Sequence, residues 1–193
     1  MTLRILITVG MLFSVATFLA GQEPATISPA ELRATNAYAR QVEQFIKLNL
    51  NKRRTFGNVG DEQDNWREFK GKVAKGQPDP ADLDEAANIW TRKGKVVASA
   101  FTFQSQSGDW AQYVTYYFRE DGTLAKIHAR LNTFYGNTSV IRDKYYSPTG
   151  TLLKTTTSYL DLKTQKPKKG ASFQDEPIPD YLTVQSLPFS KLL

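Results

Sequence analysis

The sequence of 193 residues contains no cysteine and a single histidine, His128. Without cysteine the chain has no disulfide framework, no thiol nucleophile and no attachment point for a lipid anchor behind an export signal. One histidine is also too few for a Cys-based or multi-histidine metal site. We therefore expect no metal and no cofactor. Enzymes that use a catalytic cysteine or a metal held by cysteines or several histidines are excluded.

Sequence motifs for catalysis are missing as well: the chain has no G-x-S-x-G, H-E-x-x-H, G-x-x-x-x-G-K-[ST] or G-x-G-x-x-G. A glycosidase needs only two carboxylates, and Asp109, Glu120, Asp121, Asp143 and Asp161 all fall in the predicted sheet. Asp109 and Asp121 stand in turns that favour aspartate for backbone reasons, and Asp143 is expected to form a cross-strand ion pair. A carboxylate-based hydrolase is therefore the least supported function.

The charge balance is only mildly basic, with 25 Lys and Arg against 19 Asp and Glu. These charges are spread along the chain, so the sequence carries no specific nucleic-acid signature and favours an acidic partner only weakly. Forty per cent of the residues are hydrophobic, which is typical of a globular protein. We expect a single globular domain over residues 23–193.

Residues 1–22 have the pattern of an export signal. Arg4 supplies a positive start, an apolar run covers residues 5–20, and the small residues Ala20 and Gly21 offer a cleavage site. The sequence therefore predicts a signal peptide and an exported protein, periplasmic or secreted. The alternative is an uncleaved anchor, although the run is shorter than the roughly 20 residues that span a bilayer. Membrane contact is expected only through this segment, if it stays uncleaved.

A helix is predicted over residues 29–51. Ser28 and Glu31 have the spacing of a capping box, and Pro29 suits the first helical turn. Apolar residues recur on one stripe, which should face a core. The connector over residues 52–85 is rich in glycine and proline and is expected to be irregular, with at most one short helix that includes Trp66, Phe69 and Val73.

From residue 86 the hydrophobic period changes from 3.6 to 2, and turn signals recur five times up to residue 150. This pattern predicts a meander of six antiparallel strands over residues 86–161. The strands are expected at 86–92, 95–104, 110–120, 123–135, 138–147 and 151–161. The tail over residues 162–193 begins with a basic loop and contains several prolines, but it is too apolar to be free. We expect it to lie across the sheet or the helix.

Two segments of the meander repeat each other faintly. Tyr116-Tyr117 and Tyr145-Tyr146 are each followed by a turn that ends in Gly-Thr-Leu and by a lysine two residues later. The pattern is similar to the hairpins of tyrosine–aspartate repeat proteins, and ordinary hairpin chemistry also produces it. No family is assigned from it.

Asp121-Gly122 is the strongest hairpin signal, and a two-residue turn there fixes the strand register. One face then carries apolar residues and is expected to form the core. The opposite face pairs aromatic and polar residues with cations: Tyr117 with Lys126, Thr115 with His128, and Tyr113 with Arg130. Such a face is either an ordinary solvated side of a sheet or a platform for an acidic or sugar-like ligand.

The candidate ligand-binding residues are Tyr113, Tyr117, Lys126, His128 and Arg130. A histidine can exchange protons near neutral pH, but the sequence shows neither an orienting partner nor a nucleophile for His128, so we assign it no catalytic role. The three tryptophans occur in apolar patterns typical of a core.

We therefore expect an α+β fold in which an N-terminal amphipathic helix packs on a six-stranded antiparallel β-meander. The sequence does not decide whether the meander is flat or curved. The function favoured is that of an exported, non-catalytic binding or envelope-associated protein that uses the sheet face. The alternative is a carrier that holds an apolar ligand between a curved sheet and the helix, which requires a hollow interior.

Overall fold

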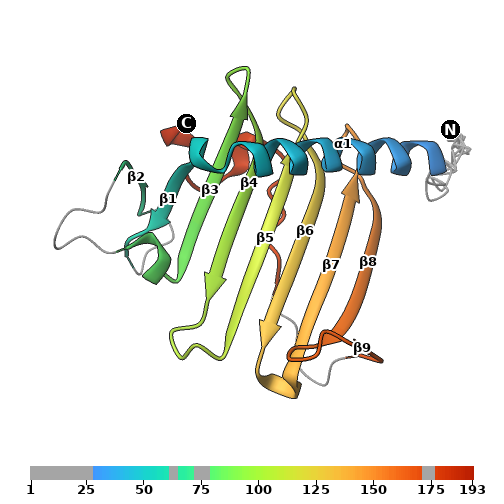
Figure 1. Cartoon of the computed structure of the whole chain (residues 1–193). Coiled ribbons are helices and arrows are strands. Elements are labelled where there is room, and N and C mark those ends of the chain that lie inside the picture. The colour runs from blue at the N-terminus through green and yellow to red at the C-terminus, as the bar shows by residue number, and fades with distance from the viewer. Residues whose placement is uncertain (1–27, 61–64, 72–78, 171–176) are drawn as a thin grey trace, which may run out of the picture.

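The structure is a computed structural model, and it describes residues 28–60, 65–71, 79–170 and 177–193. The predicted signal peptide and Val73 lie outside these residues. The α+β class is confirmed: one long helix crosses a single open antiparallel sheet of nine strands, in the order β2-β1-β3-β4-β5-β6-β7-β8-β9 (Figure 1). Among the described residues, no helix combines the length and apolar character needed to cross a membrane.

Helix α1 extends over Pro29–Leu48 and is followed by a 3-10 turn at Leu50–Lys52. Pro29 occupies its first turn as expected, but the predicted capping box does not form because the Ser28 side chain makes no capping hydrogen bond. The helix ends before Asn49, whose Nδ2 donates to the carbonyl oxygen of Phe45 at 2.8 Å. The prediction of one helix to residue 51 was therefore slightly too long.

The six predicted strands are present within one or two residues of their expected ends. They are β3 (Glu85–Arg92), β4 (Lys95–Gln104), β5 (Trp110–Phe118), β6 (Leu124–Thr133), β7 (Thr138–Tyr146) and β8 (Leu152–Asp161). The expected count of six was nevertheless wrong, because the sheet continues at both edges. β1 (Arg54–Asn58) and β2 (Trp66–Phe69) extend one edge, and β9 (Pro167–Lys168) extends the other.

The connector was predicted to be irregular because it is rich in glycine, and this was wrong for β1 and β2. Gly57 lies inside β1, opposite Arg67 of β2 and Ala86 of β3. A Cβ atom at Gly57 would lie 2.3 Å from Cδ1 of Leu83, so any larger residue here would require the Leu83 side chain to move. Trp66 and Phe69, which were expected on a short helix, belong to strand β2.

Three hairpins of the meander share a bulge. In the β5–β6 hairpin Tyr117 pairs with Lys126 but Phe118 pairs with Leu124, which leaves Ala125 as the extra residue. The β7–β8 hairpin repeats this, with Tyr145 opposite Lys154 and Tyr146 opposite Leu152. The register also shifts in the β3–β4 hairpin, after Trp90. The sequence repeat is therefore structural, but Tyr145 corresponds to Tyr117 and not to Tyr116.

The turn at Asp121-Gly122 is not the expected two-residue turn. The amide of Gly122 donates to the carbonyl oxygen of Arg119 at 2.9 Å, Arg119 pairs with Thr123, and Gly122 has a φ of +84°. This is a three-residue loop that closes on a left-handed glycine. The bulge at Ala125 compensates for the longer loop, so the predicted register holds from Tyr117 opposite Lys126 down the hairpin.

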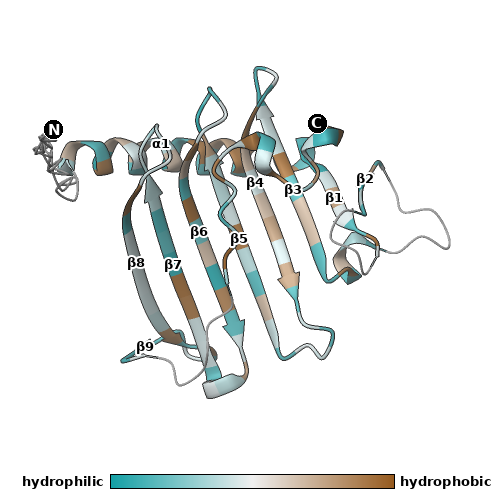
Figure 2. Cartoon of the chain, turned by 180° about the vertical axis from the view of Figure 1, so that it is seen from behind, coloured by the Kyte–Doolittle hydropathy of each residue, from teal (hydrophilic) through white to brown (hydrophobic). Residues whose placement is uncertain are grey.

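The two faces of the sheet are covered by different segments (Figures 1 and 2). The C-terminal segment lies on the face that was predicted to be the core, where Phe189 stacks on Phe56 at 4.4 Å and Tyr116 donates to the carbonyl oxygen of Pro179. This confirms that the tail lies across the sheet. Helix α1 lies on the opposite face, where Val42 packs in a cluster with Trp90 and Tyr117. The helix therefore covers the face that was expected to be open.

Candidate functional site

The α1-side face of the sheet is divided by the helix into a covered and an uncovered part. Helix α1 crosses the strands near the ends at which the three bulged hairpins turn (Figure 1). Trp90 and Tyr117 lie beneath it, and each bonds to a residue of the helix region. Trp90 Nε1 donates to the carbonyl oxygen of Asn49 at 3.2 Å, and the Tyr117 hydroxyl donates to Oε1 of Glu43 at 3.0 Å.

Two of the five predicted ligand-binding residues are buried in this covered part. Tyr117 is 3% exposed and Lys126 is 8% exposed. Burial, together with the nearby carboxylate of Glu43, raises the pKa of Tyr117 far above its usual value, so the hydroxyl stays protonated and donates. Tyr117 is therefore a structural contact of the helix, and the buried Lys126 is paired with Asp143, so neither belongs to an open platform.

The other three predicted residues lie together on the uncovered part. Tyr113 is 47% exposed and faces Arg130 across the strands, in the register that the sequence predicted. The guanidinium of Arg130 donates to Oε1 of Gln165 at 2.7 Å, which fixes its position. His128 lies two residues closer to the helix along β6, on the same face, and 41% of its side chain is exposed. An aromatic ring, a guanidinium and an imidazole are thus presented on one open surface.

Asp143 of β7 lies where the covered and uncovered parts of this face meet, and it contacts a residue of each part. Its Oδ1 lies 2.8 Å from Nδ1 of His128 and 3.1 Å from Nζ of Lys126, and the Lys126 ammonium lies 5.2 Å from the ring centre of Tyr145. Burial alone would raise the pKa of Asp143, but the hydrogen bonds from His128 and Lys126 outweigh it and the pKa is lowered. An ionised Asp143 requires His128 to donate from Nδ1, which leaves Nε2 to meet a ligand.

The sequence did not reveal Asp143 as the orienting partner of His128, because the loop between β6 and β7 is longer than a hairpin turn at Gly136-Asn137. A two-residue turn there would place Tyr145 opposite His128. The strands instead pair Thr133 with Thr138, and this shift brings Asp143 opposite His128. The expected cross-strand ion pair at Asp143 is present, and its cation is Lys126.

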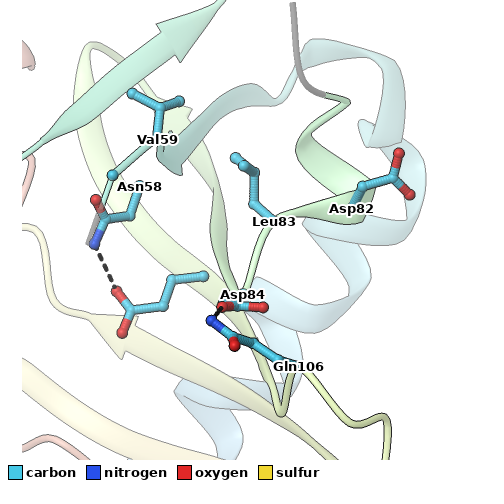
Figure 3. Close-up of a pocket in the computed structure, with 8 residues that line it drawn as sticks. Asn58, Val59, Asp82, Leu83, Asp84 and Gln106 are labelled. Atoms are coloured by element: carbon cyan, nitrogen blue, oxygen red, sulfur yellow. Dashed lines mark hydrogen bonds between the residues drawn. The ribbon is translucent and has the colours of Figure 1, made fainter.

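A second feature is a cleft of about 630 Å³ where β1 ends and β3 begins (Figure 3). Its polar lining is already engaged in part, since Asn58 Nδ2 donates to Glu85 at 3.3 Å and Gln106 Nε2 donates to Asp84 at 3.1 Å. The carboxylates make this cleft unsuitable for an acidic ligand. It also lies apart from Tyr113, His128 and Arg130, none of which lines it.

The space between α1 and the sheet is filled by side chains. Ala39 and Val42 of the helix are at most 1% exposed, and they pack with Trp90 and Ala98 of the sheet. This packing does not favour a carrier with a hollow interior. Trp66 and Trp90 are buried as expected, and among the described residues no three His, Asp or Glu side chains are grouped closely enough to hold a metal ion.

Comparisons with known proteins give no relative from which a function could be transferred. No protein-family model, no curated protein and no solved structure matches the chain.

Proposed function

We propose that this chain is an exported, non-catalytic binding protein whose ligand site is the uncovered part of the α1-side sheet face. The observation that supports it is the grouping of Tyr113, His128 and Arg130 on the surface that the helix leaves open. Two of these groups are held by partners, His128 by Asp143 and Arg130 by Gln165. Such preorganised side chains lose little conformational entropy when a ligand binds.

The chemistry of the three groups favours a small anionic ligand with an apolar ring face, such as an acidic sugar. The Tyr113 ring can stack on the ring face of the ligand, and the planar guanidinium of Arg130 can bind a carboxylate through two parallel hydrogen bonds. Nε2 of His128 adds a polar contact.

The test is calorimetric titration of the purified protein with trigalacturonate and with the neutral trisaccharide maltotriose, at low and at 0.3 M salt. We expect selective binding of trigalacturonate that weakens as salt rises, because exposed charges are screened beyond about 8 Å at physiological ionic strength. Arg130→Gln should weaken binding about tenfold and flatten the salt dependence. Tyr113→Ala should weaken binding at every salt concentration.

Arg53→Gln is the matched control, because it removes one exposed cation at the far end of α1. It should leave the affinity within about twofold of the wild type, since distant exposed charges are largely screened. Equal binding of the acidic and neutral sugars, or an Arg130→Gln variant that binds like Arg53→Gln, would refute the proposed site.

Export is part of the proposal and is supported by the pattern of residues 1–22. Amino-terminal sequencing of protein recovered outside the cytoplasm should begin near residue 23. A sequence that begins at Met1 would contradict cleavage.

A further inference from the structure

The end of the sheet farthest from α1 carries two loops that are joined to each other. The first is the β6–β7 turn at residues 134–137, and the second is the β8–β9 loop at residues 162–166. The amide of Leu162 donates to the carbonyl oxygen of Asn137 at 2.9 Å, and Asn137 Nδ2 donates to Oδ2 of Asp161 at 2.6 Å. Lys168 Nζ, at the start of the tail, donates to Oγ1 of Thr138 at 3.0 Å. We call these two loops with Lys168 and Lys169 the basic–aromatic tip (Figure 1).

Two large aromatic side chains protrude from this tip. Phe134 is 71% exposed and Tyr135 is 59% exposed, although most aromatic side chains of the described chain are packed in the core. The backbone presents them because Gly136 and Asn137 both adopt positive φ values, +61° and +49°, and turn the chain sharply after them. Neighbouring exposed rings on a rigid turn are unusual for a surface in contact only with water.

Within the described residues, the same tip also carries several exposed lysines. Lys163, Lys166 and Lys169 are exposed, and none of them forms an ion pair with a residue that the structure describes. The nearest described acidic group is Asp161, at the end of β8, which accepts hydrogen bonds from the adjoining loop. Its Oδ1 accepts from the amides of Lys163 and Thr164 at 3.1 and 2.8 Å. As far as the described residues extend, these three lysines are therefore open to an external anion.

We propose that the basic–aromatic tip docks the protein on the surface of an anionic lipid bilayer. The tip adjoins the ligand site on the sheet face, because Gln165 of its second loop accepts a hydrogen bond from Arg130. Aromatic side chains prefer the headgroup region, where an apolar ring meets a wet boundary. Lysines beside them are attracted to the negative surface potential of anionic lipids. A soluble polyanion would use the lysines alone and would leave Phe134 and Tyr135 without a role, which is why a bilayer fits this surface better.

The absence of cysteine allows a direct test in the full chain. A single cysteine introduced by Tyr135→Cys can be labelled with an environment-sensitive nitrobenzoxadiazole group. Leu48→Cys provides the matched control, because Leu48 is 83% exposed and lies at the opposite end of the strands, on α1 (Figure 1). Each labelled protein is mixed with vesicles of phosphatidylcholine alone and of phosphatidylcholine with 30% phosphatidylglycerol.

We expect the label at residue 135 to brighten and shift to the blue only on the anionic vesicles, and the label at residue 48 to remain in water. A response at residue 48 without one at residue 135 would show that another part of the chain, including residues 5–20, approaches the bilayer, and would overturn the proposal. An equal response at residue 135 on both vesicle types would overturn the role of the lysines.

Charge variants complete the test by co-sedimentation with the anionic vesicles. Lys163→Gln with Lys166→Gln should weaken binding about twenty-five-fold, because each lysine near such a surface contributes roughly fivefold in affinity. The control Lys52→Gln with Arg53→Gln removes the same charge at the other end and should change binding less than about twofold. Comparable losses in both pairs would show that net charge alone drives association. Wild type and Phe134→Ser are also compared for binding to soluble polyglutamate. If the two proteins bind polyglutamate equally well, and wild type binds the anionic vesicles no more tightly than polyglutamate, bilayer docking is refuted.

Discussion

Replacing Asp143 by asparagine should destabilise the fold far more than the removal of an exposed carboxylate. Asp143→Asn keeps the shape of the side chain but removes the negative charge between His128 and Lys126. The side chain of Lys126 is only 10% exposed, so its ammonium would be left in a poorly hydrated position beside Tyr145. An unpaired buried charge is costly because neither water nor a partner compensates it.

The magnitude follows from the burial of the group. Removing one partner of a fully buried pair costs about 3–5 kcal/mol, whereas exposed pairs contribute about 0–1 kcal/mol. The Asp143 side chain is 22% exposed and that of Lys126 is 10% exposed, which places the Lys126–Asp143 pair between these limits. We expect a loss of about 2 kcal/mol, which lowers the Tm by roughly 4–8 °C in a domain of this size.

The loss should depend on pH with a definite sign. The pKa of Asp143 is lowered in the folded protein, so its stabilising contribution is present above the unfolded value of about 3.9 and is lost as the pH falls through the folded value. Urea unfolding followed by tryptophan fluorescence should therefore show the full difference between wild type and Asp143→Asn at pH 7. The difference should shrink towards zero below pH 4.

Two variants control this measurement. Glu120→Gln breaks a 3.6 Å contact to Arg92, and the Glu120 side chain is 63% exposed, so its cost should stay below about 0.5 kcal/mol. Lys126→Met with Asp143→Leu replaces the pair by apolar side chains and should recover most of the stability. If Asp143→Asn were no more costly than Glu120→Gln at pH 7, the proposed burden of an unpaired Lys126 would be wrong.

Three further substitutions test the packing of the fold. Phe189→Ala should cost about 3–5 kcal/mol in chemical denaturation, because Phe189 is 1% exposed and stacks on Phe56; a cost under 1 kcal/mol would mean that the tail does not stabilise the sheet. Tyr117→Phe removes the hydrogen bond to Glu43 and should cost about 1 kcal/mol at neutral pH, and an unchanged unfolding midpoint would exclude that bond. Gly150→Ala places a Cβ atom in open space at a φ of +83°, so its cost of about 1 kcal/mol measures backbone strain alone, and thermal unfolding without a decrease in Tm would contradict it.

Local chemistry made the meander predictable. Turn residues mark the ends of β3 to β8, and alternation along each strand places its side chains on two faces. Both the strand ends and the two faces could therefore be predicted from the sequence. The predicted register from Tyr117 towards Trp110 was also correct, although the predicted loop at Asp121-Gly122 was one residue shorter than the loop in the structure. The extra residue Ala125 cancelled that error. The alternating pattern of one strand does not predict a bulge, because a bulge depends on how that strand pairs with its neighbour.

The candidate site was only partly predictable for a similar reason. Counting residues from one turn placed Tyr113 opposite Arg130 correctly. The partner of His128 comes from β7, and its position depends on the conformation of the β6–β7 loop, where Gly136 and Asn137 have positive φ values. Nor could the count show that Tyr117 and Lys126 would be buried, since burial depends on the segment that covers them.

The sequence by itself determined the α+β class, the central strands and the two chemically distinct faces of the sheet, because these depend on hydrophobic period and turn residues that act within a few positions. The tertiary structure alone decided which segment covers which face. Both α1 and the C-terminal tail are apolar enough to cover a sheet, and both faces carry buried clusters, so the pattern fits either arrangement. Tertiary contacts settle the choice: Val42 packs with Trp90 and Tyr117 on one face, and Phe189 stacks on Phe56 on the other. Complementary packing between segments distant in sequence therefore leaves Tyr113, His128 and Arg130 open.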